Sequence, residues 1–332
     1  MASLADFTTL HVGGSPRSFT SATSQSDIIN AVTNADNENR SLLILGGGSN
    51  IIVADHIDLD VIHIASSGFT NDPSVCAGAW VTVEAGHSWD DLVAYAVAHE
   101  WTGIEALSGI PGTVGATPIQ NVGAYGQQVS DTIAQVRAWN RQTQQVDTLF
   151  TETCEFSYRS SVFKEHPDRW VILSVTFQLK FGTLSAPIQF DELARELGVE
   201  LGARVAMTDV REAVLALRQR KGMLVNPADH DTWSTGSCFL NPRVDAAPVG
   251  APAWEQPDGR FKVSAAWLIE NSGFAKGFGV NDRATLSNKH TLAITNRGGA
   301  TAADIIELAD VIRAGVSDTF GIELEFEPQI VR

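Results

Sequence analysis

The chain has 332 residues, of which 44% are hydrophobic and 19% are charged, and its formal net charge is −16. This length exceeds that of one ordinary compact core, so we expect two or three domains or subdomains. The acidic balance argues against a nucleic-acid partner or an anionic-membrane surface, because phosphate backbones bind clustered cations. A small anionic ligand is compatible with it, since such a ligand needs only a few well-placed cations.

The three cysteines, Cys76, Cys154 and Cys238, are widely separated and form no CxxC pair. Neither a disulfide framework nor a metal site is therefore expected. The N-terminus lacks a basic segment followed by an apolar run, and no apolar stretch is long enough to span a bilayer. We therefore expect a soluble, cytoplasmic protein.

Hydrophobic periodicity predicts a mixed α+β domain that ends near residue 182. Its glycine-dense segment at 109–126 cannot be a regular helix, because each interior glycine costs about 0.5–1 kcal/mol there. In chain order we expect a helix at 27–35, a strand, glycine turn and further strands within 41–65, a strand at 80–86, a helix at 88–101 capped by Ser88, a long shaped loop at 109–126, and strands at 133–139, 146–149 and 171–179.

The second half contains three amphipathic patterns of helical period, at 207–222, 264–273 and 301–321. The chain then ends in a pattern of period two, at 322–331, which predicts a strand. Its apolar residues face one way, and Glu323, Glu325 and Glu327 face the other. A solvated acidic edge is the simpler interpretation of these glutamates, and spacing alone does not single one out.

Two glycine-rich segments suggest an anion or cofactor site. The turn GGGSN at 46–50 follows a strand, which is typical of a phosphate cradle, although a plain tight turn explains it equally. It lacks the third glycine and the following helix of the dinucleotide fingerprint, and the chain has no Gly-Lys dipeptide, so a Rossmann site and a nucleotide P-loop are not expected. The uncharged loop at 109–126 would suit a flat heteroaromatic ring and its pyrophosphate.

Charged groups elsewhere leave two interpretations open. Arg159, within FSYRSSVFK, could bind a ligand carboxylate with two hydrogen bonds from its guanidinium, or simply pair with a surface acid. The cations at 211–221 are most simply interpreted as the solvated end of a helix, although they could bind a ligand. In GSCFLNP, at 236–242, either Ser237 or Cys238 could act as a proton donor.

Taken in order, the segments LGGGSN, IPGTVGATPIQNVGAYG, YRSSVFK, GSCFLNP, AAWLIENSG and LEFE resemble the UDP-N-acetylenolpyruvoylglucosamine reductases. These are bacterial flavoenzymes of peptidoglycan precursor synthesis, and hence of cell shape and division. The resemblance runs from about Thr8 to Ile330. It implies an α+β fold in which a two-subdomain FAD-binding module of the vanillyl-alcohol-oxidase-like (PCMH) type precedes an α+β substrate-binding domain. The implied boundaries are 1–66, 67–182 and 183–332, with the terminal strand 322–330 returning to the active-site cleft.

The resemblance also implies the reaction and its residues. NADPH reduces a non-covalently bound FAD, and UDP-N-acetylglucosamine enolpyruvate then receives a hydride and a proton. The catalytic positions fall on Arg159, Ser237 and Glu327, with Ser237 as the proton donor. The FAD-binding positions fall on Gly46, Gly47, Gly48, Ser49, Asn50, Pro111, Gly112, Thr113, Gly115, Gln120, Asn121, Gly123, Ala124, Tyr125 and Arg218. The substrate-binding positions fall on Tyr158, Phe190, Lys221, Asn241 and Lys276.

One position departs from the pattern that the resemblance implies. The subgroup with YRxSxFK usually carries a tyrosine where this chain has Phe190, whose ring can pack but has no hydroxyl for the substrate. Two other functions remain open: an FAD-dependent alcohol or sugar oxidase of the same fold, and a non-catalytic sugar-nucleotide binder. A monomer is expected.

Overall fold

A computed structural model of the chain describes residues 2–74 and 78–332, so Cys76 lies outside the described residues. The chain forms two compact units. The larger one comprises Arg17–Gly47 and Asp58–Gln219, and the smaller one comprises the residues up to Pro16, Gly48–Ile57 and Arg220–Arg332. The three-part division expected from the sequence stays a prediction.

The larger unit begins with a parallel three-stranded sheet and one helix. Strands β1 (Ser18–Ala22), β4 (Asp60–Ile64) and β2 (Leu42–Leu45) pair in that order, and α1 (Gln25–Asn37) packs on β1 and β4. The helix forms here because Ser24 caps it by accepting a hydrogen bond from the Asp27 amide and because it buries an apolar face. The helix and both strands that the periodicity predicted in this region are confirmed.

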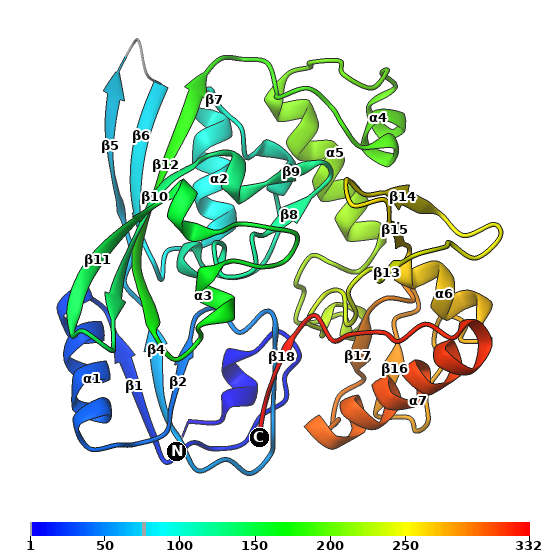
Figure 1. Cartoon of the computed structure of the whole chain (residues 1–332), viewed down its shortest axis with the longest axis horizontal. Helices are drawn as coiled ribbons and strands as arrows, with labels where there is room; N and C mark the ends of the chain where they lie inside the picture. Colours follow the sequence, from blue (N-terminus) through cyan, green and yellow to red (C-terminus); the bar gives the residue numbers. More distant parts are fainter. Residues whose placement is uncertain (1, 75–77) are drawn as a thin grey trace. The chain divides into compact units, whose positions relative to one another are not determined.

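A larger antiparallel sheet follows, in the order β11-β10-β12-β6-β5, with β7 paired to β12 (Figure 1). Its strands are β5 (Phe69–Ser74), β6 (Gly78–Glu84), β7 (Trp101–Thr102), β10 (Ile133–Asn140), β11 (Gln145–Phe150) and β12 (Trp170–Phe181). Helix α2 (Trp89–Ala98) begins at the Ser88 cap, as predicted, and ends at Ala98, three residues before the predicted end at 101.

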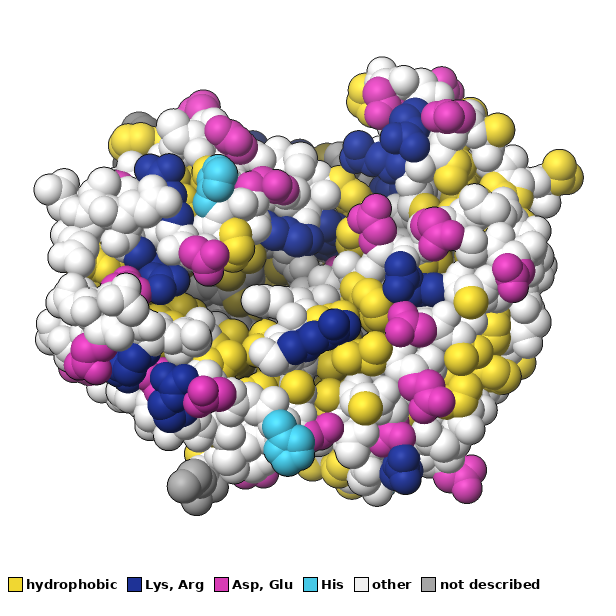
Figure 2. Space-filling view, turned by 60° about the horizontal axis from the view of Figure 1, so that its bottom comes forward, with side chains coloured by type: hydrophobic (Ala, Val, Ile, Leu, Met, Phe, Trp, Pro, Cys, Tyr) yellow, Lys and Arg dark blue, Asp and Glu magenta, His cyan; other side chains and the backbone are white. Residues whose placement is uncertain are grey.

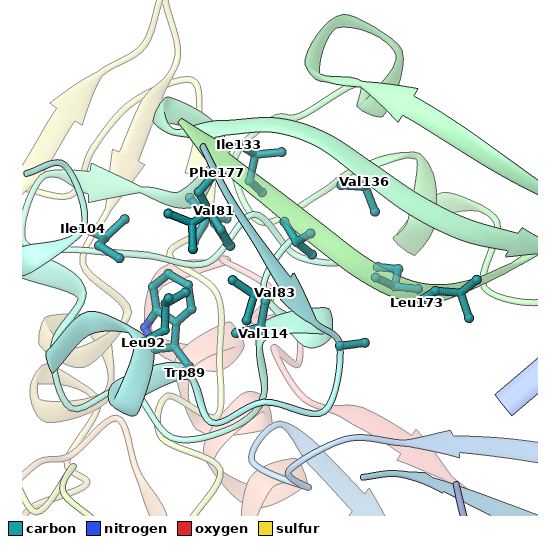
Figure 3. Packing of buried hydrophobic residues seen from close by; sticks show 14 of the residues in the cluster. Val81, Val83, Trp89, Leu92, Ile104, Val114, Ile133, Val136, Leu173 and Phe177 are labelled. Carbon is teal, nitrogen blue, oxygen red and sulfur yellow. The ribbon is translucent and has the colours of Figure 1, made fainter. Parts of the chain in front are cut away.

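Both sheets of the larger unit share one hydrophobic core. Figure 3 shows Trp89 and Leu92 of α2 beside Val81, Val83 and Phe177 of the antiparallel sheet. The Trp89 ring is fully buried, and its Nε1 donates to the Leu107 carbonyl at 3.0 Å, which satisfies its polar atom. Because Ile28 of α1 and Ile62 of β4 belong to the same cluster, the two sheets are one packed body.

The remaining elements of the larger unit include α4 (Asp191–Leu197) and α5 (Met207–Arg220), which share a second apolar cluster. In it Leu193 packs with Val210, Val214 and Leu217. The others are α3 (Val162–Glu165), the hairpin strands β8 (Gly123–Ala124) and β9 (Gln127–Gln128), and the 3₁₀ turns η2 (Glu105–Leu107), η3 (Val114–Ala116), η4 (Val129–Asp131) and η5 (Thr151–Cys154). The expected helix at 207–222 is thus confirmed as α5, ending two residues earlier. The glycine loop forms no α-helix, as predicted, but it is not structureless, since it holds η3 and the β8–β9 hairpin.

The smaller unit is built around helix α7 (Ala302–Phe320). Thr301 and Asp304 form a reciprocal capping box at its start, and Gly321 ends it in the left-handed conformation. Asp304 also accepts hydrogen bonds from Arg283 at 2.5 and 3.0 Å. The other elements are η1 (Leu4–Phe7), β3 (Ile51–Val53), η6 (His230–Thr232), β13 (Arg243–Val244), β14 (Ala253–Glu255), β15 (Phe261–Val263), α6 (Ala265–Asn271), β16 (Ala284–Leu286), β17 (Ile294–Asn296) and β18 (Gln329–Val331).

The last segment corrects one expectation. A regular strand at 322–331 was predicted, but only β18 is regular, and it pairs in parallel with β3. The residues before it instead meet the chain near Phe239 through an isolated antiparallel bridge between Phe239 and Phe326. The predicted alternation in burial holds up to this bridge, with Leu324 buried and Glu323 and Glu325 exposed. Strands β1, β5, β7 and β13–β17 had not been predicted, because they are short or mostly polar.

On the face shown in Figure 2, basic side chains stand among acidic ones and form no continuous field. Across residues 2–74 and 78–332, none of the helices combines the length and the apolar character needed to cross a membrane. The same described part contains no group of three or more His, Cys, Asp or Glu side chains arranged to hold a metal ion.

Candidate functional site

The two glycine-rich segments touch each other within the larger unit. A Cβ added to Gly47 would lie 2.6 Å from the Cα of Gly112, and one added to Gly46 would lie 2.7 Å from Oγ1 of Thr113. The contact at Gly47 is with backbone, so that position requires glycine, whereas a side chain at position 46 would require the Thr113 hydroxyl to turn aside. The sequence predicted that the turn and the loop serve one ligand, and their backbones do meet.

The start of the glycine loop is anchored on both sides of Gly109. Its amide donates to Oδ1 of Asp90 at 2.6 Å, and its carbonyl accepts from Nε of Arg218 at 3.1 Å. Arg211 in turn holds Asp90 with two hydrogen bonds of 2.7 and 2.8 Å. Helix α5 thus fixes the loop through Arg211 and Arg218. The sequence alone had favoured a solvated helix end for these cations, and the structure shows that these two arginines hold the loop instead.

Burial and charge act on these groups in opposite directions. Burial alone would raise the pKa of Asp90, but the hydrogen bonds from Arg211 and from the Gly109 amide outweigh it and hold this pKa below its ordinary value. For Arg218 burial dominates and lowers the pKa of the guanidinium. An arginine stays protonated at neutral pH all the same, so Arg218 brings a buried positive charge to the loop.

A turn carrying Tyr158 and Arg159 is attached to the middle of the loop. Ser157 and Ser160 exchange backbone hydrogen bonds of 3.0 and 3.3 Å, which hold Arg159 at a left-handed φ of 55°. The buried Asn121 donates from Nδ2 to the Ser157 carbonyl at 3.2 Å. These bonds fix the backbone that carries Arg159 against the middle of the glycine loop.

Several predicted FAD-binding residues shape the loop itself. Asn121 also donates from Nδ2 to Oε1 of Gln128 and accepts at Oδ1 from the Ser130 amide, so its amide is engaged by the protein. Tyr125, at the tip of the β8–β9 hairpin, has a left-handed φ of 49°. Its ring meets that of Phe190 edge to face, with centroids 5.7 Å apart and an angle of 90°. Tyr125 and Phe190 were predicted to bind different ligands, and the structure brings them together.

In the smaller unit, the Ser237–Cys238 segment lies beside Glu327. The Glu327 amide donates to the Cys238 carbonyl at 3.0 Å, and the Leu240 amide donates to the Glu325 carbonyl at 2.9 Å. Cys238 is buried at 1% exposure, and burial, followed by the nearby charge of Glu327, raises its pKa well above the ordinary thiol value. Ser237 is half-buried. The acidity that would have favoured the thiol is thus removed, and of the two neighbours Ser237 is the more accessible.

Asn50, the last residue of the glycine turn, reaches the same place. Its Nδ2 donates to the Glu327 carbonyl at 3.3 Å, and its own carbonyl accepts from the Gln329 amide at 3.0 Å. Gly48, two residues before Asn50, has a left-handed φ of 59°, and a Cβ there would lie 1.9 Å from the Phe7 carbonyl oxygen. The turn therefore has a second task that its sequence did not reveal, which is to hold the backbone of Glu327.

The remaining predicted substrate residues are spread over the smaller unit. Asn241 accepts from the Ala265 amide at 2.9 Å, so its oxygen helps to begin α6. Lys221 is half-buried and precedes Gly222, whose left-handed backbone packs against the Asp231 carbonyl. Lys276 is exposed. The three predicted catalytic residues are divided, with Arg159 in the larger unit and Ser237 and Glu327 in the smaller one.

Sequence reasoning missed Asp90, which holds the loop, and Glu105, whose carboxylate accepts four hydrogen bonds at the base of the loop. The signal of Asp90 in the sequence is weak, because it stands in the first turn of a helix, where acids are common. Glu105 was the one recognisable case, because it is a lone acid in the apolar run GIEALSG.

These residues suit a flavin dinucleotide. Two glycine backbones that meet without side chains bring main-chain amides together, which is the donor set that a pyrophosphate needs. Arg218 adds a buried cation at the Gly109 carbonyl, at the start of the same loop. Consistent with this, residues 16–148 match the family model described as "FAD binding domain". The class of protein is therefore an FAD-binding oxidoreductase.

The particular family follows from the rest of the chain. Residues 226–331 match the model described as "UDP-N-acetylenolpyruvoylglucosamine reductase, C-terminal domain". A protein with that enzyme name from Cutibacterium acnes is 52% identical over 99% of this chain and 89% of its own length, and one from Thermobifida fusca is 47% identical over 99% and 96%. The chain belongs to the UDP-N-acetylenolpyruvoylglucosamine reductase family. A crystal structure of the reductase from Thermus caldophilus shares the fold, with a TM-score of 0.67 at 24% identity over 100% of this chain and 98% of that one.

Proposed function

We propose that this protein reduces the enolpyruvyl group of UDP-N-acetylglucosamine enolpyruvate to a lactyl ether, with NADPH as the reductant, giving UDP-N-acetylmuramate for peptidoglycan precursor synthesis. Family membership supports the reaction. The observation that carries the residue assignment is the backbone pairing of Glu327 with Cys238, which brings the terminal glutamate to the segment containing Ser237. The protein would act as a monomer in the cytoplasm, in support of cell shape and division.

The residues that would hold FAD are those at the contact between the turn at 46–50 and the loop at 109–126, together with Arg218. When bound, FAD supplies the relay that takes a hydride from NADPH and passes it to the CH2 carbon of the enolpyruvyl group. The protein's own part is to bind and orient the substrate and to move one proton.

Three side chains would share the tasks of binding the substrate and transferring the proton. Arg159 holds the substrate carboxylate in its planar fork, which also stabilises the negative charge that develops beside it. Ser237 gives its Oγ proton to the carbon next to that carboxylate, so that one hydride and one proton together saturate the double bond. Glu327 shapes the charge around this carbon. Lys221 would stabilise the alkoxide left on Ser237 until solvent returns a proton.

Substrate recognition would use cations and aromatic rings. Tyr158 and Phe190 would line the pocket in the larger unit, while Lys221, Asn241 and Lys276 would contact the sugar nucleotide from the smaller one. The net charge of −16 does not oppose this, because an anionic substrate responds to the cations nearest to it.

An absorption spectrum of the purified protein tests the proposal against its two alternatives. We expect bound FAD that is released by denaturation and is bleached by NADPH. FAD that stays attached after denaturation, together with bleaching by an alcohol or a sugar, would favour an oxidase. A protein that binds the sugar nucleotide but takes up no flavin would be a non-catalytic binder.

A further inference from the structure

Glu105 is a carboxylate buried at the base of the glycine loop, with 1% of its surface exposed. It accepts four hydrogen bonds. Its Oε2 accepts from the Gly103 amide at 2.6 Å, and its Oε1 accepts from the Ala186 amide at 2.6 Å, from Nε2 of Gln127 at 3.0 Å and from Oγ1 of Thr102 at 3.4 Å. All four donors are uncharged groups. Burying a carboxylate is costly unless its oxygens are satisfied, so an acid here implies that the acceptors are needed.

The four donors come from three separate parts of the larger unit. Thr102 and Gly103 precede η2, Gln127 lies in β9 after the tip of the hairpin, and Ala186 lies between β12 and α4. Gln127 also accepts, at Oε1, from the Ala106 amide at 2.8 Å. One carboxylate therefore joins the base of the loop, the hairpin and the segment that leads to α4.

Each of the two distant parts carries one ring of the aromatic pair. Tyr125 lies two residues before Gln127, and Phe190 lies four residues after Ala186. Their rings meet edge to face at 5.7 Å. The backbones are equally close, since a Cβ on Gly126 would come within 2.9 Å of the Cβ of Gln189.

The Phe190 side of this pair is held by packing of the neighbouring Ile188 and by backbone hydrogen bonds. Phe190 is 37% exposed and stands at the N-cap of α4 without a side-chain capping bond. The segment before it is tied to the chain between α4 and α5 by the hydrogen bonds of Ser185 and Ile188 with Val205 and Ala203. Toward the base of the glycine loop, it donates a hydrogen bond from the Ala186 amide to Glu105, and Ile188 packs with Ala106.

We propose that Glu105 is a positioning residue for the enolpyruvyl sugar nucleotide, because its carboxylate helps to fix the segment that carries Phe190, a residue of the proposed substrate pocket, against Tyr125. This rests on the proposed function. Glu105 acts through the segment at 184–190 and touches neither substrate nor cofactor. A glutamine is nearly the same size but turns one acceptor into a donor, which would face an N–H group in this all-donor environment.

The test uses the full-length protein with Glu105→Gln, the milder Gln127→Ala, and Asp60→Asn as the matched control. Asp60 is another buried carboxylate of the larger unit, in β4, where it accepts a hydrogen bond from Arg40. Hydrogen exchange is first followed without ligands. Losing one hydrogen bond to a charged acceptor should speed exchange at 184–190 about tenfold or more in Glu105→Gln, and less in Gln127→Ala, with no change at 184–190 in Asp60→Asn.

Steady-state and half-reaction kinetics then connect this segment to the substrate. Glu105→Gln should raise KM for UDP-N-acetylglucosamine enolpyruvate about tenfold, while flavin reduction by NADPH changes by less than about threefold. Unchanged exchange at 184–190 in both loop variants overturns the inference, whatever the protein catalyses. Faster exchange with an unchanged KM overturns its substrate part. A wild-type protein that fails to reduce this substrate refutes the proposed function instead, and the exchange result still decides whether Glu105 holds the segment.

Discussion

Replacing Gly47 with alanine tests whether the contact between the glycine turn and the glycine loop builds the cofactor site. The new Cβ would lie 2.6 Å from the Cα of Gly112, whereas ordinary van der Waals contact begins at 3.4 Å, so the two backbones must separate by at least 0.8 Å. Both atoms belong to backbone that cannot swing aside. Forced overpacking of this kind costs about 1–3 kcal/mol. Since about 1.4 kcal/mol is a tenfold change in a binding constant, we expect FAD affinity to fall by roughly 5- to 150-fold.

The assay is titration of the flavin-free protein with FAD, followed by flavin fluorescence, for wild type, Gly47→Ala and Gly182→Ala. Gly182 is the matched control, because it belongs to the same unit and the nearest atom to an added Cβ there is the Leu184 carbonyl oxygen at 3.9 Å. Gly182→Ala should bind FAD within about twofold of wild type. Wild-type affinity in Gly47→Ala, at an unchanged melting temperature, would refute the reasoning.

Four further predictions concern single residues. Ser237→Ala should leave flavin reduction by NADPH intact but slow reoxidation by the substrate about 10²–10⁴-fold in stopped-flow measurements, and equal loss of both half-reactions would reject its role as proton donor. Glu327→Gln should slow that reoxidation at least about tenfold while the exposed Glu323→Gln stays within about twofold, and equal small effects would make the segment a plain acidic edge. Phe190→Tyr should change substrate affinity by less than about 1.5 kcal/mol in calorimetry, the scale of one neutral hydrogen bond, because the ring edge is partly exposed; a larger gain would reveal an unused contact. Asp304→Asn should lower the free energy of unfolding in urea at pH 7 by about 1–2 kcal/mol, because the carboxylate that accepts hydrogen bonds from Thr301 and Arg283 is lost. Because the arginine hydrogen bond and the cap hold the pKa of Asp304 below its usual range, this difference should be full above the ordinary carboxyl pKa and shrink as the pH falls below about 4, and a difference that persists at low pH would contradict it.

Local signals in the sequence predicted helices α1, α2, α5, α6 and α7, but not the short α3 and α4. Ser88 and Thr301 each stand at the start of an apolar period and cap the helix that follows, so the information lies within a few residues. The terminal strand was predicted too long, because a period of two is also found in an extended segment that is not part of a sheet. The residues before β18 are extended in this way and are held by one isolated bridge and a few backbone hydrogen bonds. Periodicity reports which face is buried, and it does not report whether a ladder continues.

The site was predictable only where a motif carried it. The glycine turn and loop could be recognised as a cofactor segment, but their mutual contact joins positions 47 and 112, and the bond from Asn50 to Glu327 spans 277 residues. No local rule predicts such contacts. Glu105 shows the same limit, because a single acid in an apolar run does not reveal that its partners lie at Gln127 and Ala186.

The most direct test of the central claim is a single turnover under anaerobic conditions in D2O. The NADPH-reduced protein is mixed with UDP-N-acetylglucosamine enolpyruvate, the flavin absorbance is followed, and the product is identified by mass spectrometry and NMR. The account predicts stoichiometric flavin reoxidation and a lactyl ether that carries deuterium on the carbon next to the carboxylate, because the proton from Ser237 exchanges with solvent. A flavin that stays reduced in the presence of this substrate, or a product with no deuterium at that carbon, would contradict the account.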